Sequence, residues 1–257
     1  MRFDANALFE AELARRGLTF SKEDDLVYQI QVGGWDLSVN LDNARRNAER
    51  DQDPGVITRF VENILGFSGR HPEWDEASTL LFWSAQPADS DFGASIHVAV
   101  TDTVSRVLTL SDAERTRVTW VTPSMCHKWG VTVDQACSLA ASNQNRLLEG
   151  LKLETAHGDD VSDTLGMIPL HPPYKASTIF ASAFKNLVEP VLGWPVLVVL
   201  PCRDFVYVIA ETSTLLESLG PVVVEEFRNS GHPITTEVLR ISDDGIEAIG
   251  HFPPEGA

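Results

Sequence analysis

The spacing of apolar residues predicts three helices in the first seventy positions. Residues 4–16 carry apolar side chains at helical spacing, with Asp4 placed to cap the first turn and Gly17 just beyond the last. A second helix is expected to begin at Asp42 and a third to follow Pro54. The apolar positions of the third helix are Val56, Phe60, Ile64 and Phe67. This pattern predicts a helix with one buried face.

Alternating apolar and polar residues predict a β-hairpin near each end of the chain. Residues 26–32 and 35–41 alternate on either side of Gly33 and Gly34, as in a hairpin with one solvated face. A second hairpin is predicted at 237–250, where Asp244 followed by glycine favours a type I′ turn.

The clearest helix of the second half is predicted from Thr132 to Glu149. Thr132 and Gln135 have the spacing of a capping box. The expected apolar stripe consists of Val133, Ala136, Cys137, Ala140, Leu147 and Leu148. Further helices are predicted over 123–129, 174–191 and 214–229, and strands over 104–110 and 117–121.

Two continuously apolar runs, 196–200 and 205–210, predict central strands covered on both faces. Strand pairs separated by helices indicate an α+β fold, mainly antiparallel sheet with packed helices and arranged in two lobes. The stretch 84–93, rich in Pro, Ser and Asp, is the best candidate for a boundary. We therefore expect an N-terminal α+β lobe over 1–90 and a C-terminal α+β lobe over 91–257.

Composition indicates a globular protein that does not cross a membrane. The 257 residues are 43% hydrophobic and 22% charged, and the longest apolar runs are far shorter than the roughly 20 residues of a spanning helix. The N-terminus has no uncharged segment typical of a signal peptide. The three cysteines have unrelated spacings and no C-x-x-C motif, so we expect reduced thiols and a cytoplasmic location.

The charge of the chain argues against nucleic acid as a partner. A formal charge of −17 would repel a phosphate backbone. From residue 211 onward the only Lys or Arg residues are Arg228 and Arg240, and the acidic ones are Glu211, Glu217, Glu225, Glu226, Glu237, Asp243, Asp244, Glu247 and Glu255. This excess of acidic residues is consistent with a basic protein partner. It is also explained by solubility alone, and we favour this second explanation.

No catalytic or cofactor-binding motif is evident, so we expect no cofactor. Nucleotide-binding glycine loops, H-E-x-x-H and G-x-S-x-G are all missing. The loop 157–163 groups His157 with three aspartates, but a solvated acidic loop is favoured over a metal site. Cys126 and His127 are adjacent in a predicted helix, where neighbours point about 100° apart, so they do not form a nucleophile–base pair.

Arg203 and Asp204 form the polar connection between the two apolar strands. Polar groups at the edge of a buried sheet are usually paired, which favours a structural ion pair or bonds to the backbone. A ligand-binding or catalytic role is the alternative.

The second half of the chain resembles the YtpQ-like family of uncharacterised bacterial proteins. The likeness lies in "WGVTVDQACSLAASN" (129–143) and "PVLVVLPCRDFVYVIAE" (195–211). The matching positions are Trp129, Gly130, Ala140, Asn143, Gly193, Pro201, Arg203 and Asp204. The chain departs from the pattern at Gln144, where the family has leucine, and at "HPPYKAST" (171–178), where the family has a more acidic entry to the helix. The resemblance implies a cytoplasmic bacterial protein with an α+β fold and transfers no activity.

These features support two hypotheses for function. The first is a non-catalytic module that binds a protein or a small ligand, with Arg203, Asp204, Trp129 and Asn143 as candidate binding residues. The second is a hydrolase-like enzyme that uses Arg203 and Asp204 with a histidine such as His157 or His171. Convergence of these side chains in a pocket would favour the enzyme.

Overall fold

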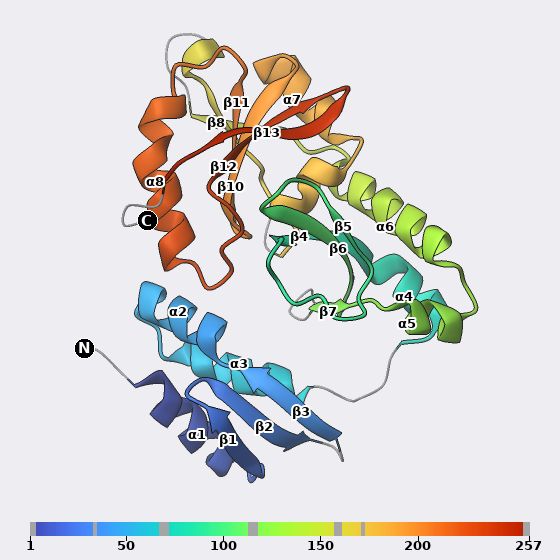
Figure 1. Cartoon of the computed structure of the whole chain (residues 1–257), viewed down its shortest axis with the longest axis vertical. Helices are drawn as coiled ribbons and strands as arrows, with labels where there is room; N and C mark the ends of the chain where they lie inside the picture. The colour runs from blue at the N-terminus through green and yellow to red at the C-terminus, as the bar shows by residue number, and fades with distance from the viewer. Residues whose placement is uncertain are drawn as a thin grey trace. The chain divides into compact units, whose positions relative to one another are not determined.

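The computed structural model describes residues 4–32, 35–66, 72–112, 118–156, 161–170 and 173–253. The chain folds into two compact units (Figure 1). Unit 1 comprises Met1–Pro72 with Asn229–His232, and unit 2 comprises Glu73–Arg228 with Pro233–Ala257. Helices pack on three sheets formed by antiparallel strand pairs in the described residues, which confirms the predicted α+β class. No helix in these ranges is both long and apolar enough to cross a bilayer.

The division between the units lies elsewhere than near residue 90. It falls between Pro72 and Glu73. The proposed boundary segment, 84–93, begins inside strand β4 (Leu81–Pro87), which pairs along its whole length with β6 (Val104–Ser111). The polar stretch after Pro87 is thus a connection within unit 2, which leads from β4 to β5 on the other side of β6, because the residues that are common in linkers are also common in turns.

Unit 1 has the helix–hairpin–helix order expected from its sequence. Its elements are α1 (Ala5–Arg15), β1 (Phe20–Asp24), β2 (Val27–Val32), β3 (Trp35–Asn40), α2 (Asp42–Asp51) and α3 (Gly55–Leu65). The Asp4 side chain caps α1 by accepting a hydrogen bond from the Ala7 N–H at 3.1 Å. Strands β2 and β3 pair from Val27↔Asn40 to Val32↔Trp35, and the Gly33–Gly34 turn lies outside the described residues. Phe9 and Tyr28 meet edge to face in the core, with ring centroids 4.9 Å apart.

Helix α3 buries a different stripe from the one its spacing predicted. Ile57, Val61 and Ile64 are buried, whereas Val56 and Phe60 are only partly covered. The helix is apolar around much of its circumference, so spacing alone did not determine which neighbouring stripe faces the core. Phe67 lies outside the described residues.

Unit 2 contains two sheets. Its strands are β4 (Leu81–Pro87), β5 (His97–Ala99), β6 (Val104–Ser111), β7 (Val118–Trp120), β8 (Glu154–Ala156), β9 (Leu165–Met167), β10 (Val196–Cys202), β11 (Phe205–Ala210), β12 (Glu237–Ser242) and β13 (Gly245–His251). Its helices are α4 (Trp74–Leu80), α5 (Pro123–Trp129), α6 (Val133–Leu148), the 3₁₀ helices η1 (Val161–Asp163) and η2 (Ala176–Phe180), α7 (Phe184–Leu192) and α8 (Leu216–Asn229).

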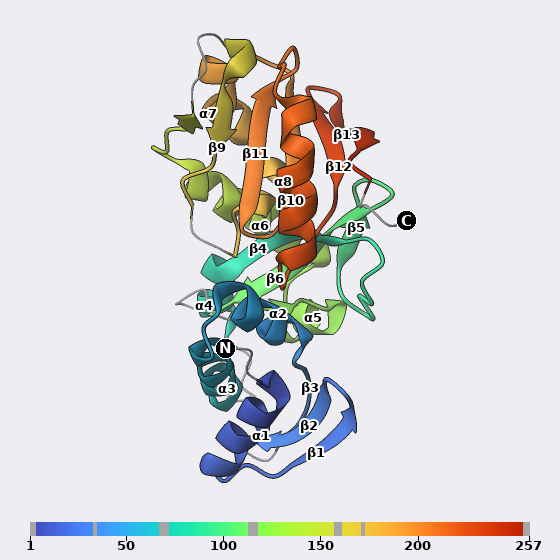
Figure 2. The same ribbon diagram turned by 90° about the vertical axis from the view of Figure 1, so that its left-hand side faces the viewer.

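The larger sheet has the strand order β13-β12-β10-β11-β9-β8, and β4, β6 and β5 form the smaller sheet, with β7 also paired to β6. All seven residues of β10 are buried, as its continuous apolar run predicted. Helices α7 and α8 cover opposite faces of the larger sheet (Figures 1 and 2). Phe184 and Val188 of α7 pack against one face, and Val223 of α8 packs against the other.

The helix predicted over 174–191 is two elements. The 3₁₀ helix η2 ends at Phe180, Ala181 is extended, and α7 begins at Phe184. The Asn145 side chain, on α6, explains where α7 starts: its Oδ1 accepts hydrogen bonds from the Ala183 N–H at 3.0 Å and the Ser182 hydroxyl at 3.2 Å. A contact between distant residues thus interrupts a periodic apolar pattern.

The closing hairpin is confirmed, but its turn is not type I′. The predicted type I′ turn, with Asp244 and Gly245 as its central residues, would place both of them at positive φ. Among the described non-glycine residues only Gln52 has a positive φ, and in this hairpin Gly245 takes that conformation, with φ of 126°. Because Gly245 lacks a Cβ, it accommodates the positive φ that the aspartates avoid.

The three cysteines are free thiols, but Cys137 is not buried as expected. Cys126 and Cys202 are buried, whereas Cys137 is half-buried. Helix α6 is rotated relative to the predicted stripe. Its buried residues are Ala136, Ala140, Asn143, Gln144 and Leu148. The buried face of α6 therefore includes two polar side chains, Asn143 and Gln144, which the predicted apolar stripe did not contain.

Candidate functional site

Arg203 and Asp204 form the turn between β10 and β11, as the sequence indicated. The strand pairing ends at Cys202↔Phe205, directly around them. The Arg203 Nε lies 3.4 Å from the Asp204 Oδ1, and their side chains are 28% and 20% exposed. This is a partly exposed ion pair between neighbouring residues, with little geometric constraint on either side chain.

Asn143 is a buried structural residue. Its side-chain amide donates hydrogen bonds to the carbonyl oxygens of Ser78 and Leu81, each at 2.9 Å, and its Oδ1 accepts from Arg146. These two carbonyls are at the C-terminal end of α4, where a helix leaves carbonyl groups without a partner. Asn143 therefore stabilises a helix end, and its amide nitrogen is engaged by these two carbonyls.

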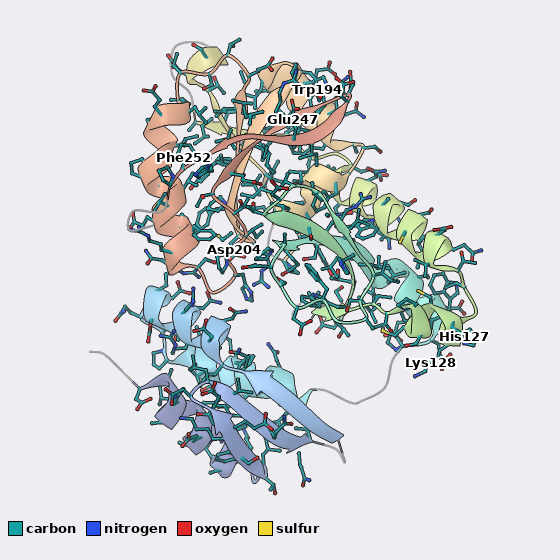
Figure 3. The ribbon with its side chains drawn as sticks, viewed as in Figure 1. His127, Lys128, Trp194, Asp204, Glu247 and Phe252 are labelled. Carbon is teal, nitrogen blue, oxygen red and sulfur yellow. The ribbon has the colours of Figure 1, made fainter. Side chains whose placement is uncertain are left out.

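Trp129 is the last residue of α5 and packs against Trp74, with ring centroids 5.9 Å apart. Both belong to the rim of the apolar cluster between α4, α5 and α6. Figure 3 labels Asp204 and Lys128, the residue before Trp129, well apart within unit 2. The four candidate residues consequently do not form one site.

The hydrolase-like alternative needs a histidine beside the Arg203–Asp204 turn. His157 and His171 both lie outside the described residues, as does most of the acidic loop 157–163. Asp163, at the end of that loop, accepts a hydrogen bond from the Thr214 hydroxyl at 2.6 Å. Within the described ranges no three metal-ligating side chains come together.

A groove in unit 2 brings together residues that the sequence did not single out. We call it the Trp194 groove; it has a volume of about 330 Å³ and lies between η2, α7, Trp194 and the β12–β13 hairpin. Its partly exposed apolar side chains are those of Phe180, Trp194 and Ile246, which lie over the buried Ile179, Phe184 and Ile241, and its polar side chains include Lys185 and Asp243. An apolar lining with a few convergent polar groups is typical of ligand sites.

The polar groups of the groove form a connected set. The Lys185 Nζ donates to both oxygens of Asp243, at 2.8 and 3.1 Å, and the Trp194 indole N–H donates to Asp243 Oδ1 at 3.1 Å. The same Nζ lies 5.2 Å from the Trp194 ring centroid, within reach of a cation–π interaction. Two donor groups thus make three hydrogen bonds to one carboxylate, at the surface, where the Lys185 and Asp243 side chains are 33% and 74% exposed.

The protonation states of this set follow from its hydrogen bonds. The bond from Lys185 lowers the pKa of Asp243, and the bond to Asp243 raises the pKa of Lys185. Both groups are therefore charged at neutral pH. A lysine held as ammonium is neither a nucleophile nor a general base, so this arrangement favours binding over covalent or proton-transfer chemistry.

The sequence offered little to locate this set. Lys185, Trp194 and Asp243 belong to a helix, the segment after it, and a hairpin turn. The pairing of β10 with β12 and the packing of α7 on the same sheet bring these regions together. The one local signal is the polar side of α7, which carries Lys185, Asn186 and Glu189. A polar side marks a helix surface and does not distinguish a groove from solvent.

No protein-family model matches the chain, and no curated protein or solved structure shows significant similarity to it. The resemblance of the second half to the YtpQ-like family therefore stays a prediction.

Proposed function

We propose that this chain is a non-catalytic binding module that takes an apolar ligand with a hydrogen-bond acceptor in the Trp194 groove. The observation that carries this proposal is the combination of a partly exposed apolar lining with a Lys185 ammonium paired to Asp243 at its margin. A cytoplasmic location in a bacterium is part of the proposal, supported by the three free thiols and the resemblance of the second half.

The chemistry of the groove supports each part of the ligand. Burial of apolar ligand surface against the lining contributes about 25 cal/mol per Å². The Lys185 ammonium has three N–H groups, of which two are directed at Asp243. The third is suited to a carbonyl, carboxylate or sulfonate oxygen of the ligand.

The test uses 1-anilinonaphthalene-8-sulfonate (ANS), a fluorescent probe with an apolar ring system and one anionic group. We expect saturable binding at one site. Lys185→Met should raise the Kd about threefold to tenfold, the equivalent of about 0.7–1.4 kcal/mol, because it leaves Asp243 unpaired beside the sulfonate. Asp243→Asn should lower the Kd, because it removes the carboxylate that competes for the ammonium.

Two control variants make the same charge changes outside the groove. Lys128→Met, on α5, and Asp134→Asn, on α6, are both at exposed positions. Neither should change the Kd, since long-range charge is screened at physiological salt. Equal Kd values for wild type, Lys185→Met and Asp243→Asn would contradict the proposal.

A further inference from the structure

Strand β13 is the one long strand edge of unit 2 that the described residues leave uncovered. It is the terminal strand of the larger sheet, with β12 as its neighbour (Figure 2). The remaining edge strands β5, β7 and β8 have three residues each. The outer edge of β4 is occupied by side chains: Gln144 donates to the Trp83 carbonyl, and the Ser177 hydroxyl accepts from the Ala85 N–H. An open edge strand is a template for a further strand.

A β-bulge limits the length over which β13 is a regular strand. The β12–β13 register shifts between Val238 and Leu239, so that Ile249 of β13 has no opposite residue. The pairing from Ser242↔Gly245 to Leu239↔Ala248 is regular. Four residues, 245–248, are therefore available for a new strand, and the first two of them line the Trp194 groove.

The two faces of this segment differ in chemistry. Ile246 pairs with Ile241, which packs in the apolar cluster on the α7 side of the sheet. Successive residues of a strand point to opposite faces, so Glu247 and its partner Arg240 face the α8 side. A strand added next to β13 would thus place alternate side chains beside the groove and beside Glu247.

The charge on the α8 side favours a basic residue there. Arg240 pairs with two carboxylates, Glu211 at 2.6 Å and Glu247 at 3.1 Å. Two acids share one guanidinium, which leaves a net charge of about −1 at this point of the edge. The Glu247 side chain is 61% exposed and so remains accessible to a second cation.

We propose that the partner of this chain is an extended peptide segment that pairs with residues 245–248 of β13. The segment directs apolar side chains into the Trp194 groove and basic side chains toward Glu247. This inference rests on the proposed function and specifies its ligand. Backbone hydrogen bonds along the edge supply affinity, and the alternating pockets supply specificity.

The test is selection of random twelve-residue peptides, displayed on phage, against the full chain. We expect enriched sequences that alternate apolar residues with Lys or Arg and have no central proline. Synthetic copies should displace ANS from the groove. Methylating the backbone nitrogens of alternate residues should abolish binding in one register and leave it nearly unchanged in the other, because only one edge of the peptide strand faces β13.

Two glutamate variants separate specific from general charge attraction. Glu247→Gln should weaken the selected peptides about threefold or more, whereas Glu225→Gln, an exposed position on α8, removes the same charge and should have no effect. A lack of enriched peptides, tolerance of methylation in both registers, equal effects of the two variants, or binding without displacement of ANS would each overturn the inference. If ANS still binds as described above in any of these cases, the proposed function stands and only the peptide partner fails.

Discussion

The side-chain amide of Gln144 donates a hydrogen bond to the backbone carbonyl of Trp83 at 3.0 Å. The same nitrogen donates to the Ser177 carbonyl at 2.8 Å, and Gln144 is only 1% exposed. A residue that looks misplaced in an apolar helix stripe therefore joins α6, β4 and η2. A leucine at this position could fill the volume but could not donate to either carbonyl.

We predict that Gln144→Leu destabilises unit 2 by about 1–3 kcal/mol. Two buried carbonyl oxygens lose a donor, and this loss exceeds the gain from removing the Gln144 Oε1, a buried acceptor with no hydrogen-bond partner among the described residues. Urea unfolding followed by tryptophan fluorescence measures the change. Ser142→Ala, an exposed neighbour on α6, is the control and should stay within about 0.5 kcal/mol of wild type. A Gln144→Leu variant as stable as wild type would show that these bonds contribute nothing net.

Asp204→Asn is predicted to lower stability by less than about 1 kcal/mol. The Arg203–Asp204 pair is partly exposed and its Nε–Oδ1 distance is 3.4 Å, so its loss removes a weak interaction. Thermal unfolding of wild type, Asp204→Asn and Arg203→Ala at equal ionic strength tests this. A loss of 2 kcal/mol or more, on the order of a buried charged bond, would mean that the turn holds a stronger contact than this pair.

Cys137 is predicted to react first among the three thiols of the native protein. It is half-buried, whereas Cys126 and Cys202 are 1% and 0% exposed. Burial raises the pKa of Cys137 and of Cys126, so little thiolate is present at pH 7 and labelling is expected to accelerate as the pH rises.

Mass spectrometry after timed alkylation identifies the order. Three labelled thiols in urea serve as the reference for complete reaction. Labelling of Cys202 before Cys137 would contradict the prediction. It would show that local opening of β10 exposes Cys202 faster than reagent reaches Cys137 on α6.

The Asp243 carboxylate is predicted to titrate below its ordinary pKa of 3.8. Its bond from Lys185 lowers the pKa, so the stabilisation it provides is complete above pH 3.8 and is lost as the pH falls through the lower, folded pKa. The Trp194 indole N–H, which donates to this carboxylate, is the reporter in an NMR titration. Lys185→Met should move the midpoint upward, and Lys128→Met should not. If Lys185→Met leaves the titration midpoint of Asp243 unchanged, a group other than Lys185 lowers the pKa of Asp243.

Local patterns were sufficient where a single segment determines its own structure. The capping box of Thr132 and Gln135 located the start of α6, and both of its hydrogen bonds are present. Two continuous apolar runs identified β10 and β11. In each case the determining interactions lie within a few residues or follow from burial alone, which sequence spacing encodes directly.

Sequence patterns did not predict the structure where contacts between distant residues determine it. The Pro, Ser and Asp residues of 84–93 predict a boundary, but the first residues of this stretch belong to β4, whose pairing with the distant strand β6 no local composition encodes. The break before α7 depends on Asn145. Likewise, Lys185 and Asp243 are 58 positions apart, and no local periodicity relates them.

The pairing of strand β10 also affects the rate at which the larger sheet folds. Its pairing with β11 closes a short hairpin, but its pairing of Val196 with Ile241 closes a loop of about 45 residues. Because loop-closure entropy is lost before such a contact is stabilised, we expect β10–β12 association to limit the refolding rate. Substitutions at this junction should therefore slow refolding, while equally destabilising ones in the β12–β13 turn should mainly speed unfolding.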